Sequence, residues 1–433
     1  MKLLEHVTDE YDCLESYRFL GITLMEKATV VYSRPRPETN RPIKQIYKRF
    51  LGRTIYKAKY YNWNGLFKRE ISILSLPIVG TLKLNGYKSY FVLGIKVYSK
   101  PLKFLTDFKA ECIDNLDKRH DDVYVILGHL GDAFRILTLV KGIIKEKQSK
   151  NPLIMVFDDS FEDLIKMMHI DIPYVKIKAT KPYKERLEKQ LSTDVFLLGN
   201  FKIILLWNRW LWATRFYTHR GLPADTHVID VHAAYYNVIY DNHKMGKLYT
   251  LPDAEENMLK LSKQSELNLD KFVFIAPEAF SYTLCPIEFW QKLIKIFQEA
   301  GYDVFINTVT KRHAGKKYSY MNAKSRLFDF DSIDNVKSFF LTVPEAYALA
   351  KRAKKIVSQR SGLSDLLIQT DAELCILYSF ANNWDKTDHI IKIESVMRSP
   401  YANPKKINEI NIIGMSQEDI IKSVVESLKI QTD

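Results

Sequence analysis

The sequence lacks the features that mark secreted, zinc-binding or membrane-spanning chains. Its 433 residues hold only four cysteines, which stand far apart and so exclude both a paired zinc site and a dense disulfide scaffold. Residues 1–15 are acidic and have no apolar core, and no uninterrupted apolar run reaches the ~18–20 residues that cross a bilayer. We therefore expect a cytoplasmic protein with buried thiols, attached to membranes only peripherally. The cysteines are Cys13, Cys112, Cys285 and Cys375.

Acidic residues are scarce in residues 41–110, which contain fifteen lysines and arginines but only Glu70 and Asp107. This window accounts for the whole net charge of +13. Because it is also rich in tyrosine and phenylalanine, it suits nucleic acid, a membrane surface or an anionic substrate, and a merely solvated basic surface is the simplest alternative.

Three segments of the N-terminal region place aromatic residues before Leu-Gly and an apolar alternation after it; they begin at Tyr17, Tyr47 and Tyr87. Their spacings differ, so they do not predict a solenoid. We expect small β-ribbons within an appended, basic and aromatic region, residues 1–118.

Residues 121–147 predict the opening of a βαβ unit. The apolar run Val123 to Leu127 breaks at Gly128, and helical spacing of apolar residues begins after Gly131. Asp132 then stands at the start of a helix, where open α/β sheets bind ligands and where an ordinary N-terminal cap also stands. Both interpretations of Asp132 stay open.

The second half of the chain repeats this order of strand, loop and helix. Phe272 to Ala276 predicts a strand, Pro286 a helix start, and Lys355 to Ser358 a strand that leads into Ser361 to Ser364. A strand, a Ser-Gly turn and a helix would aim backbone N–H groups at an anion, and Arg360 would add a guanidinium, which favours a diphosphate site over an ordinary βα turn.

This pattern predicts an α/β protein with residues 119–248 and 249–433 as two domains of the doubly wound, Rossmann-like kind, joined through a polar linker at 248–270. A last helix is expected at 415–428, capped by Ser416. The aromatic segment 205–220 suits either a sugar or lipid headgroup, or a buried helix.

No metal site is predicted. Asp159 or Ser160 is expected to cap a helix rather than bind a cation, and His227 and Asp230 lack further ligands. The acids Asp329 and Asp331 are expected in a solvated loop.

Three motifs together resemble the heptosyltransferase-like glycosyltransferases of bacterial polysaccharide synthesis: Gly131-Asp132, Pro286 to Trp290, and Ser361 to Asp365. The resemblance covers residues 121–380. It implies two Rossmann-like domains in the glycosyltransferase-B (GT-B) arrangement, and an inverting, metal-independent transfer with no cofactor besides the nucleotide-sugar donor substrate. It also implies Asp132 as the catalytic base; donor contacts from Arg360, Ser361, Gly362, Leu363, Ser364, Glu278 and Thr283; and acceptor contacts from Gly131, His129 and His227.

The chain departs from the family at two places. Arg360 stands where the family has an acid, and Asp365 stands where it has a histidine. Thr283 lies near the position of a common lysine. The donor therefore cannot be named from the resemblance. The expected partners are a saccharide acceptor carried on a lipid, for capsule or lipopolysaccharide, and an anionic membrane surface. The alternative function is an α/β protein that binds nucleic acid or another anionic polymer without catalysis.

Overall fold

The structure is a computed structural model and describes residues 4–9, 14–19, 22–31, 44–50, 53–63, 66–73, 76–84, 87–93, 95–178, 182–190, 195–206, 227–238, 246–279, 282–308, 330, 333, 335–379, 394–398 and 402–431. The chain divides into two compact units. The first comprises Met1–Val125, Asn151–Leu153 and Ile177–Thr214, and the second comprises Ile126–Lys150, Ile154–Lys176 and Arg215–Asp433.

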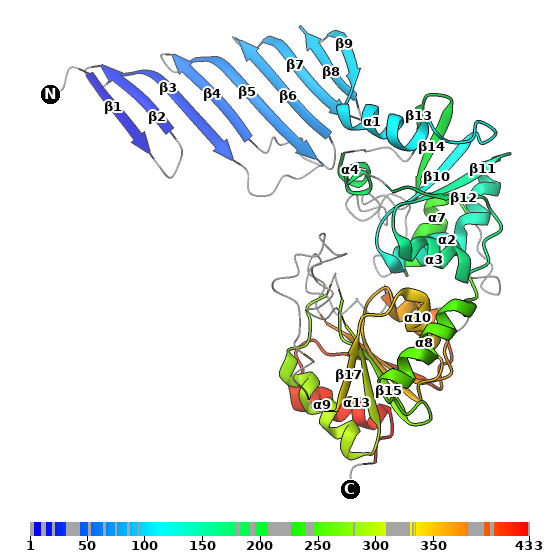
Figure 1. The fold of residues 1–433 in the computed structure, drawn as a ribbon. Coiled ribbons are helices and arrows are strands. Elements are labelled where there is room, and N and C mark those ends of the chain that lie inside the picture. The colour runs from blue at the N-terminus through cyan, green and yellow to red at the C-terminus, as the bar shows by residue number, and fades with distance from the viewer. Residues whose placement is uncertain are drawn as a thin grey trace. The chain divides into compact units, whose positions relative to one another are not determined.

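The first unit contains a nine-stranded antiparallel sheet whose strands follow one another in chain order (Figure 1). The segments that begin at Tyr17, Tyr47 and Tyr87 are therefore parts of one sheet and not separate ribbons, because antiparallel neighbours need only short connections and no fixed period. The strands are β1 Leu4–Asp9, β2 Leu14–Phe19, β3 Ile22–Val31, β4 Lys44–Phe50, β5 Arg53–Trp63, β6 Leu66–Ile73, β7 Leu76–Leu84, β8 Tyr87–Val92 and β9 Ile95–Pro101.

Helical segments follow this sheet in the first unit: α1 (Lys103–Phe108), the π-helix η2 (Lys109–Ile113) and, later in the chain, α4 (Tyr183–Gln190). The ring of Phe108 packs against that of Tyr183 with centroids 5.5 Å apart, and both side chains are buried.

A five-stranded sheet has the order β12-β11-β10-β14-β13. Every residue of β10 is buried, as its continuous apolar run predicts, and helix α2 follows it. The neighbours β11 and β12 are parallel, whereas β13 and β14 form an antiparallel pair. The elements are β10 Asp122–Ile126, α2 Leu130–Glu146, β11 Pro152–Val156, α3 Asp159–Met167, β12 Tyr174–Lys176, β13 Val195–Leu198, β14 Phe201–Leu206 and α7 Val228–Tyr236.

A six-stranded, fully parallel sheet lies in the second unit in the order β17-β16-β15-β18-β19-β20. Numbered along the chain, this order is 3-2-1-4-5-6, the doubly wound arrangement, whose direction of winding reverses between β15 and β18. The strands are β15 Phe272–Ala276, β16 Asp303–Asn307, β17 Val336–Phe339, β18 Lys355–Gln359, β19 Glu373–Tyr378 and β20 Ile407–Asn411. The predicted α/β fold class is thus confirmed.

Helices cover both faces of this sheet. Alternate residues of β15 point to opposite faces: Phe274 packs in the core under α8 and α10, and Ile275 packs in the core under α9 and α13. The final helix α13 therefore packs on its own sheet, and Lys292 of α9 pairs with Glu418 of α13 at 3.0 Å. The helical segments are α8 Pro252–Gln264, α9 Ile287–Glu299, α10 Val343–Ala350, α11 Ser364–Leu367, η6 (a 3₁₀ helix) Val396–Arg398 and α13 Gln417–Ser427.

The segment expected to be a polar linker contains helix α8. Pro252 occupies the first turn of that helix, where a missing N–H costs nothing, so it begins the helix and does not interrupt it. The cysteines within the described residues, Cys112, Cys285 and Cys375, are free and buried as predicted, while Cys13 lies outside the described residues.

Candidate functional site

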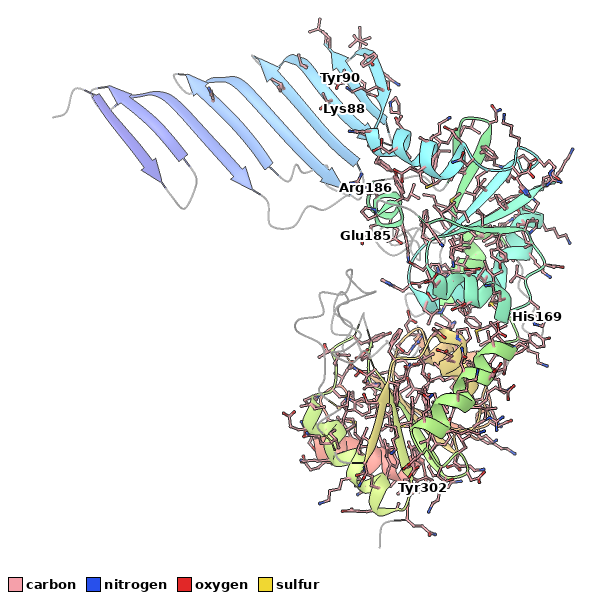
Figure 2. The ribbon with its side chains drawn as sticks, in the orientation of Figure 1. Lys88, Tyr90, His169, Glu185, Arg186 and Tyr302 are labelled. Atoms are coloured by element: carbon pink, nitrogen blue, oxygen red, sulfur yellow. The ribbon has the colours of Figure 1, made fainter. Side chains whose placement is uncertain are left out.

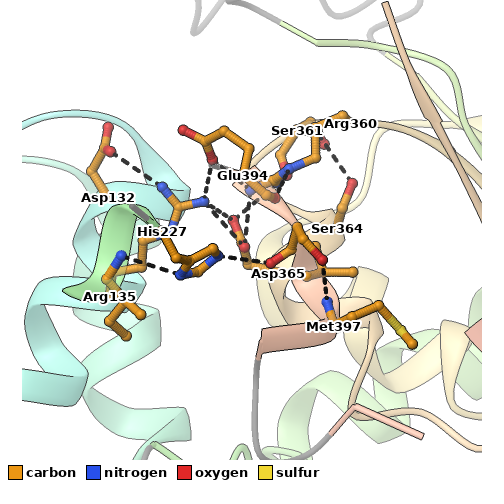
Figure 3. Close-up of polar contacts among 12 residues, drawn as sticks. Asp132, Arg135, His227, Arg360, Ser361, Ser364, Asp365, Glu394 and Met397 are labelled. Atoms are coloured by element: carbon orange, nitrogen blue, oxygen red, sulfur yellow. Dashed lines mark hydrogen bonds and ion pairs between the residues drawn. The ribbon is translucent and has the colours of Figure 1, made fainter. Parts of the chain in front are cut away.

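Four charged side chains meet where helix α2 approaches the turn after β18, within the second unit (Figure 3). Arg135 Nη2 lies 3.3 Å from each carboxylate oxygen of Asp365 and 2.7 Å from Glu394 Oε2. Arg360 binds Asp365 in a bidentate manner: Nη1 donates to Oδ2 and Nη2 donates to Oδ1, both at 3.1 Å. Its Nη2 also donates to Glu394 Oε2 at 2.9 Å. Two guanidinium groups thus share two carboxylates.

This charge cluster, defined as Arg135, Arg360, Asp365 and Glu394, has no net charge when all four groups are ionised. Arg135, Arg360 and Asp365 are buried, and a buried charge persists only when it is paired. Burial alone would raise the pKa of Asp365, but the charges of Arg135 and Arg360 hold that pKa below its usual value. Asp365 is therefore ionised near neutral pH.

All five donors of Arg360 have acceptors inside the protein. The Nε group donates to the Glu394 carbonyl at 3.1 Å, one Nη1 hydrogen reaches the Ser361 carbonyl, and the other three bonds go to Asp365 and Glu394. The predicted contact between Arg360 and a diphosphate remains a prediction. In this structure Arg360 fixes the turn.

Two glycines allow α2 to touch the turn after β18. A Cβ atom on Gly362 would lie 2.4 Å from the backbone nitrogen of Gly131, and a Cβ on Gly131 would lie 2.7 Å from Asp365 Oδ2. No side chain fits at such distances, so the close approach requires glycine at both positions. The structure thus brings together the two glycine turns that the sequence placed 231 residues apart.

Asp132 stands at the start of α2 as both interpretations expected. Its Oδ2 accepts a hydrogen bond from the backbone N–H of His129 at 3.1 Å, which is the cap, and its Oδ1 lies 3.9 Å from Arg135 Nη1. The side chain keeps 15% of its surface exposed. Burial raises the pKa of Asp132, and the nearby Glu394 adds to this, against the lowering effects of Arg135 and His129. Asp132 is therefore a partly accessible carboxylate with a stronger affinity for a proton than an ordinary aspartate.

His227 caps helix α7 and contacts the segment that carries Glu394. Its Nε2 donates to the carbonyl of Ser395 at 2.8 Å, and its Nδ1 accepts from the N–H of Ile229 at 3.4 Å. Burial, with the charge of Arg135, lowers the pKa of His227 to about 4, so the ring is neutral at pH 7 with its proton on Nε2. Both ring nitrogens are engaged within the protein, and the predicted acceptor contact is untested.

The predicted donor turn, Ser361 to Ser364, follows β18 at the carboxyl end of the sheet. Ser364 is buried, and its Oγ accepts from the N–H of Ser361 at 3.1 Å and contacts Ser358 Oγ at 3.0 Å. The helix that follows, α11, has only four residues. It contributes little dipole, so an anion here would be held mainly by the turn itself.

Glu278 and Thr283 lie after β15, the strand beside β18. Glu278 Oε1 accepts from Thr308 Oγ1 at 2.5 Å, and the carbonyl of Thr283 accepts from Ser379 Oγ at 2.6 Å. The buried side chain of Gln359 also donates to the Thr283 carbonyl and to Ser379 Oγ. These residues join the carboxyl ends of four strands, β15, β16, β18 and β19.

The sequence analysis missed Arg135, Glu394 and Gln359 as site residues. Arg135 carried one signal, because it stands three residues after Asp132 and between apolar neighbours on the buried side of α2. The sequence around Glu394 gave no indication of a site residue. The aromatic segment after Leu206, together with Asp329 and Asp331, lies outside the described residues.

Within the described residues, no group of histidine, cysteine and acidic side chains could hold a metal ion. A search of the same residues also finds no helix with the length and apolar character needed to cross a bilayer.

No protein-family model matches the chain, and no curated protein matches it by sequence. Among solved structures it is similar to the glycosyl transferase family 9 protein from Veillonella parvula (12% identity, 73% of this chain and 93% of that one, TM-score 0.43) and to E. coli ADP-heptose lps heptosyltransferase II (12% identity, 71% and 98%, TM-score 0.45). It is also similar to E. coli heptosyltransferase WaaC with ADP (12% identity, 71% and 99%, TM-score 0.40). These solved structures are glycosyltransferases of the kind that the three sequence motifs resemble, and at such identities and scores the activity has to be argued from the chain's own residues.

Proposed function

We propose that the protein is an inverting, metal-independent glycosyltransferase that moves a sugar from a nucleotide-diphosphate sugar to a saccharide hydroxyl. One observation carries the proposal. Asp132, a carboxylate with a raised pKa, stands beside the glycine turn that follows β18, at the point where the doubly wound sheet reverses its winding. Ligands of open α/β sheets bind outside the carboxyl ends of the strands at that point.

The chemistry assigns one task to each side of the site. Asp132 takes the proton of the acceptor hydroxyl as that oxygen attacks the anomeric carbon, and its raised pKa strengthens it as a base. The turn Ser361 to Ser364 receives the leaving diphosphate, and Glu278 and Thr283 complete the donor side. Arg360 fixes the turn through its hydrogen bonds to Asp365. A direct contact between Arg360 and phosphate would require the hydrogen bond from Arg360 Nη2 to Glu394 to break.

The acceptor saccharide would lie on the α2 side, near His129 and Gly131, with His227 holding the neighbouring segment in place. Sugar transfer of this kind builds bacterial surface polysaccharides on lipid carriers, so we place the protein in the cytoplasm, at the inner face of the membrane. The two α/β sheets would then belong to the two domains of the GT-B fold, with residues 1–118 as an extension.

The test begins with donor binding by the full chain, measured as thermal stabilisation by sugars carried on UDP, GDP, ADP, CMP and dTDP. A stabilising donor is then used for turnover, with and without EDTA. Asp132→Asn should lower turnover by ~10²–10⁴-fold and leave donor binding unchanged. Asp158→Asn, at the equivalent strand end before α3, is the matched control and should keep full activity.

Near-normal turnover by Asp132→Asn would show that another group is the base. Loss of activity with EDTA would refute the metal-independent mechanism. If no nucleotide sugar stabilises the protein and RNA binds it with a steep dependence on salt, the alternative of a nucleic-acid-binding protein is the better one.

A further inference from the structure

The residues that connect neighbouring strands differ between the two ends of the nine-stranded sheet. At one end, the register leaves two residues between the last pairs of β2 and β3, β4 and β5, β6 and β7, and β8 and β9. The sequence there is Leu-Gly, Leu-Gly, Leu-Ser and Leu-Gly. At the other end, the last pairs of β5 and β6 and of β7 and β8 enclose Asn-Gly.

Leucine is a poor choice for such a position. Two-residue hairpin connections favour Asn-Gly because their backbone needs positive φ values. Leu93, which the structure describes, has φ +49°, a conformation that costs an L-residue with a bulky side chain roughly 1–2 kcal/mol. Its side chain is also 63% exposed. Both the positive φ and the exposure to water disfavour leucine at position 93. We therefore attribute the leucine to a partner that its side chain contacts, and not to the needs of the turn.

The apolar character continues around Leu93. Its strand-end neighbours Val92 and Ile95 are paired in the register and are 42% and 69% exposed. Val79 of β7 pairs with Val92 and is exposed as well. The end of the hairpin formed by β8 and β9 is therefore an exposed apolar edge.

Behind this edge the side chains change in a fixed order along the hairpin. Phe91 and Lys96 form the next pair, and beyond a register shift Tyr90 pairs with Tyr98, with ring centroids 5.7 Å apart. Lys88 and Lys100 are paired two residues farther back than the tyrosines. Lys88 Nζ lies 4.7 Å from the centre of the Tyr90 ring (Figure 2). At ~3.3 Å of rise per residue, the tyrosines lie roughly 7 Å and the lysines roughly 13 Å behind the apolar pair.

We propose that this end of the sheet, led by the hairpin of β8 and β9, inserts into the surface of an anionic lipid bilayer. Apolar groups enter ~5–10 Å into the headgroup and acyl boundary, tyrosines settle at the headgroups, and lysines pair with anionic phosphates. The order of Leu93, the tyrosines and the lysines follows that sequence of layers. The paired lysines repel each other on the sheet, and an anionic surface relieves this repulsion.

The inference deepens the proposed function, because it names the part of the chain that meets the membrane carrying the acceptor. The binding itself is measured without donor or acceptor. The full chain is sedimented with vesicles of phosphatidylcholine and phosphatidylglycerol in equal parts, and with pure phosphatidylcholine, at low and high salt. We expect binding to the anionic vesicles that high salt reverses.

Leu93→Asn is the decisive variant. Asparagine accepts φ +49° more readily than leucine, so the hairpin should be at least as stable, while vesicle binding should fall about tenfold through the loss of roughly two buried CH₂ groups. Leu93→Gly, which also accepts this φ, should behave in the same way. Leu197→Asn is the matched control, because Leu197 is 70% exposed on β13 and lies outside the sheet end.

The inference fails if the full chain does not bind vesicles, or if it binds them equally well at any lipid charge and salt concentration. It also fails if the variants at positions 93 and 197 lower vesicle binding equally. A change of oligomeric state on Leu93→Asn, without a change in vesicle binding, would likewise overturn it. The proposed function fails separately. A chain that binds vesicles but no nucleotide sugar refutes the transferase and leaves the membrane contact standing, and the reverse result refutes only the membrane contact.

Discussion

Asp365→Asn should destabilise the second unit far more than an ordinary surface substitution. Asp365 is the carboxylate that both guanidinium groups of the charge cluster contact, at 3.1 Å from Arg360 and 3.3 Å from Arg135. Asparagine leaves two buried positive charges that share Glu394, with Asp132 as a more distant partner of Arg135 at 3.9 Å. Removing one partner of a buried ion pair costs about 3–5 kcal/mol. For a domain of ~150–250 residues this corresponds to a fall of roughly 10 °C in Tm.

The measurement is thermal unfolding of the full chain followed by circular dichroism. Asp371→Asn serves as the control, because Asp371 is fully exposed and pairs with Lys406 at 3.7 Å, a contact that should contribute less than ~1 kcal/mol. Adding Arg360→Gln to Asp365→Asn restores the balance of charge, so the double variant should recover part of the loss. Equal Tm values for Asp365→Asn and Asp371→Asn would refute the argument that the charge cluster holds this region together.

The pH dependence of the same effect has a definite sign. The folded pKa of Asp365 is lowered, so its contribution is complete above the ordinary carboxyl pKa of ~3.9 and is lost as the pH falls through the folded value. The difference in stability between wild type and Asp365→Asn should therefore close only in strong acid. A difference that disappears near neutral pH would contradict an ionised, paired Asp365.

Three further predictions follow from the site. Because burial raises the pKa of Asp132, the acidic limb of a plot of kcat/KM against pH should lie above pH ~4. Arg135→Gln removes a charge that lowers this pKa, so it should move the limb to higher pH. An unchanged limb would show that it does not report the titration of Asp132. Gly362→Ala should lower both Tm and turnover, since its Cβ would lie 2.4 Å from the Gly131 nitrogen, whereas Gly414→Ala has open space around it and should show only the ~1 kcal/mol of a strained φ. Turnover should be the same after dialysis against EDTA, and any activity restored by a divalent cation would contradict this.

The sequence was sufficient for the parts of the fold that depend on local chemistry. The apolar runs gave β10, β15 and β18 to within a residue or two. Ser416 also marked a helix start correctly, because its side chain bonds the first turn: Asp419 N–H donates to Ser416 Oγ at 3.2 Å.

Long-range pairing was beyond the sequence. Arg135 meets Asp365 across 230 residues and Glu394 across 259, and no local pattern specifies which buried charge will find which partner. The single nine-stranded sheet was missed for a related reason. Leu-Gly is not a typical turn dipeptide, and the aromatic segments predicted small separate β-ribbons, but no local pattern indicated that all nine strands join into one sheet.

The two-residue connections of the nine-stranded sheet also determine how that sheet can fold. Each strand pairs with the one before it, so its contacts are local in the chain, whereas β10 and β14 of the five-stranded sheet are neighbours separated by more than seventy residues. Local contacts close quickly because little loop entropy is lost. During synthesis the sheet can therefore lengthen hairpin by hairpin as the chain leaves the ribosome, before the residues that complete either α/β sheet have been translated.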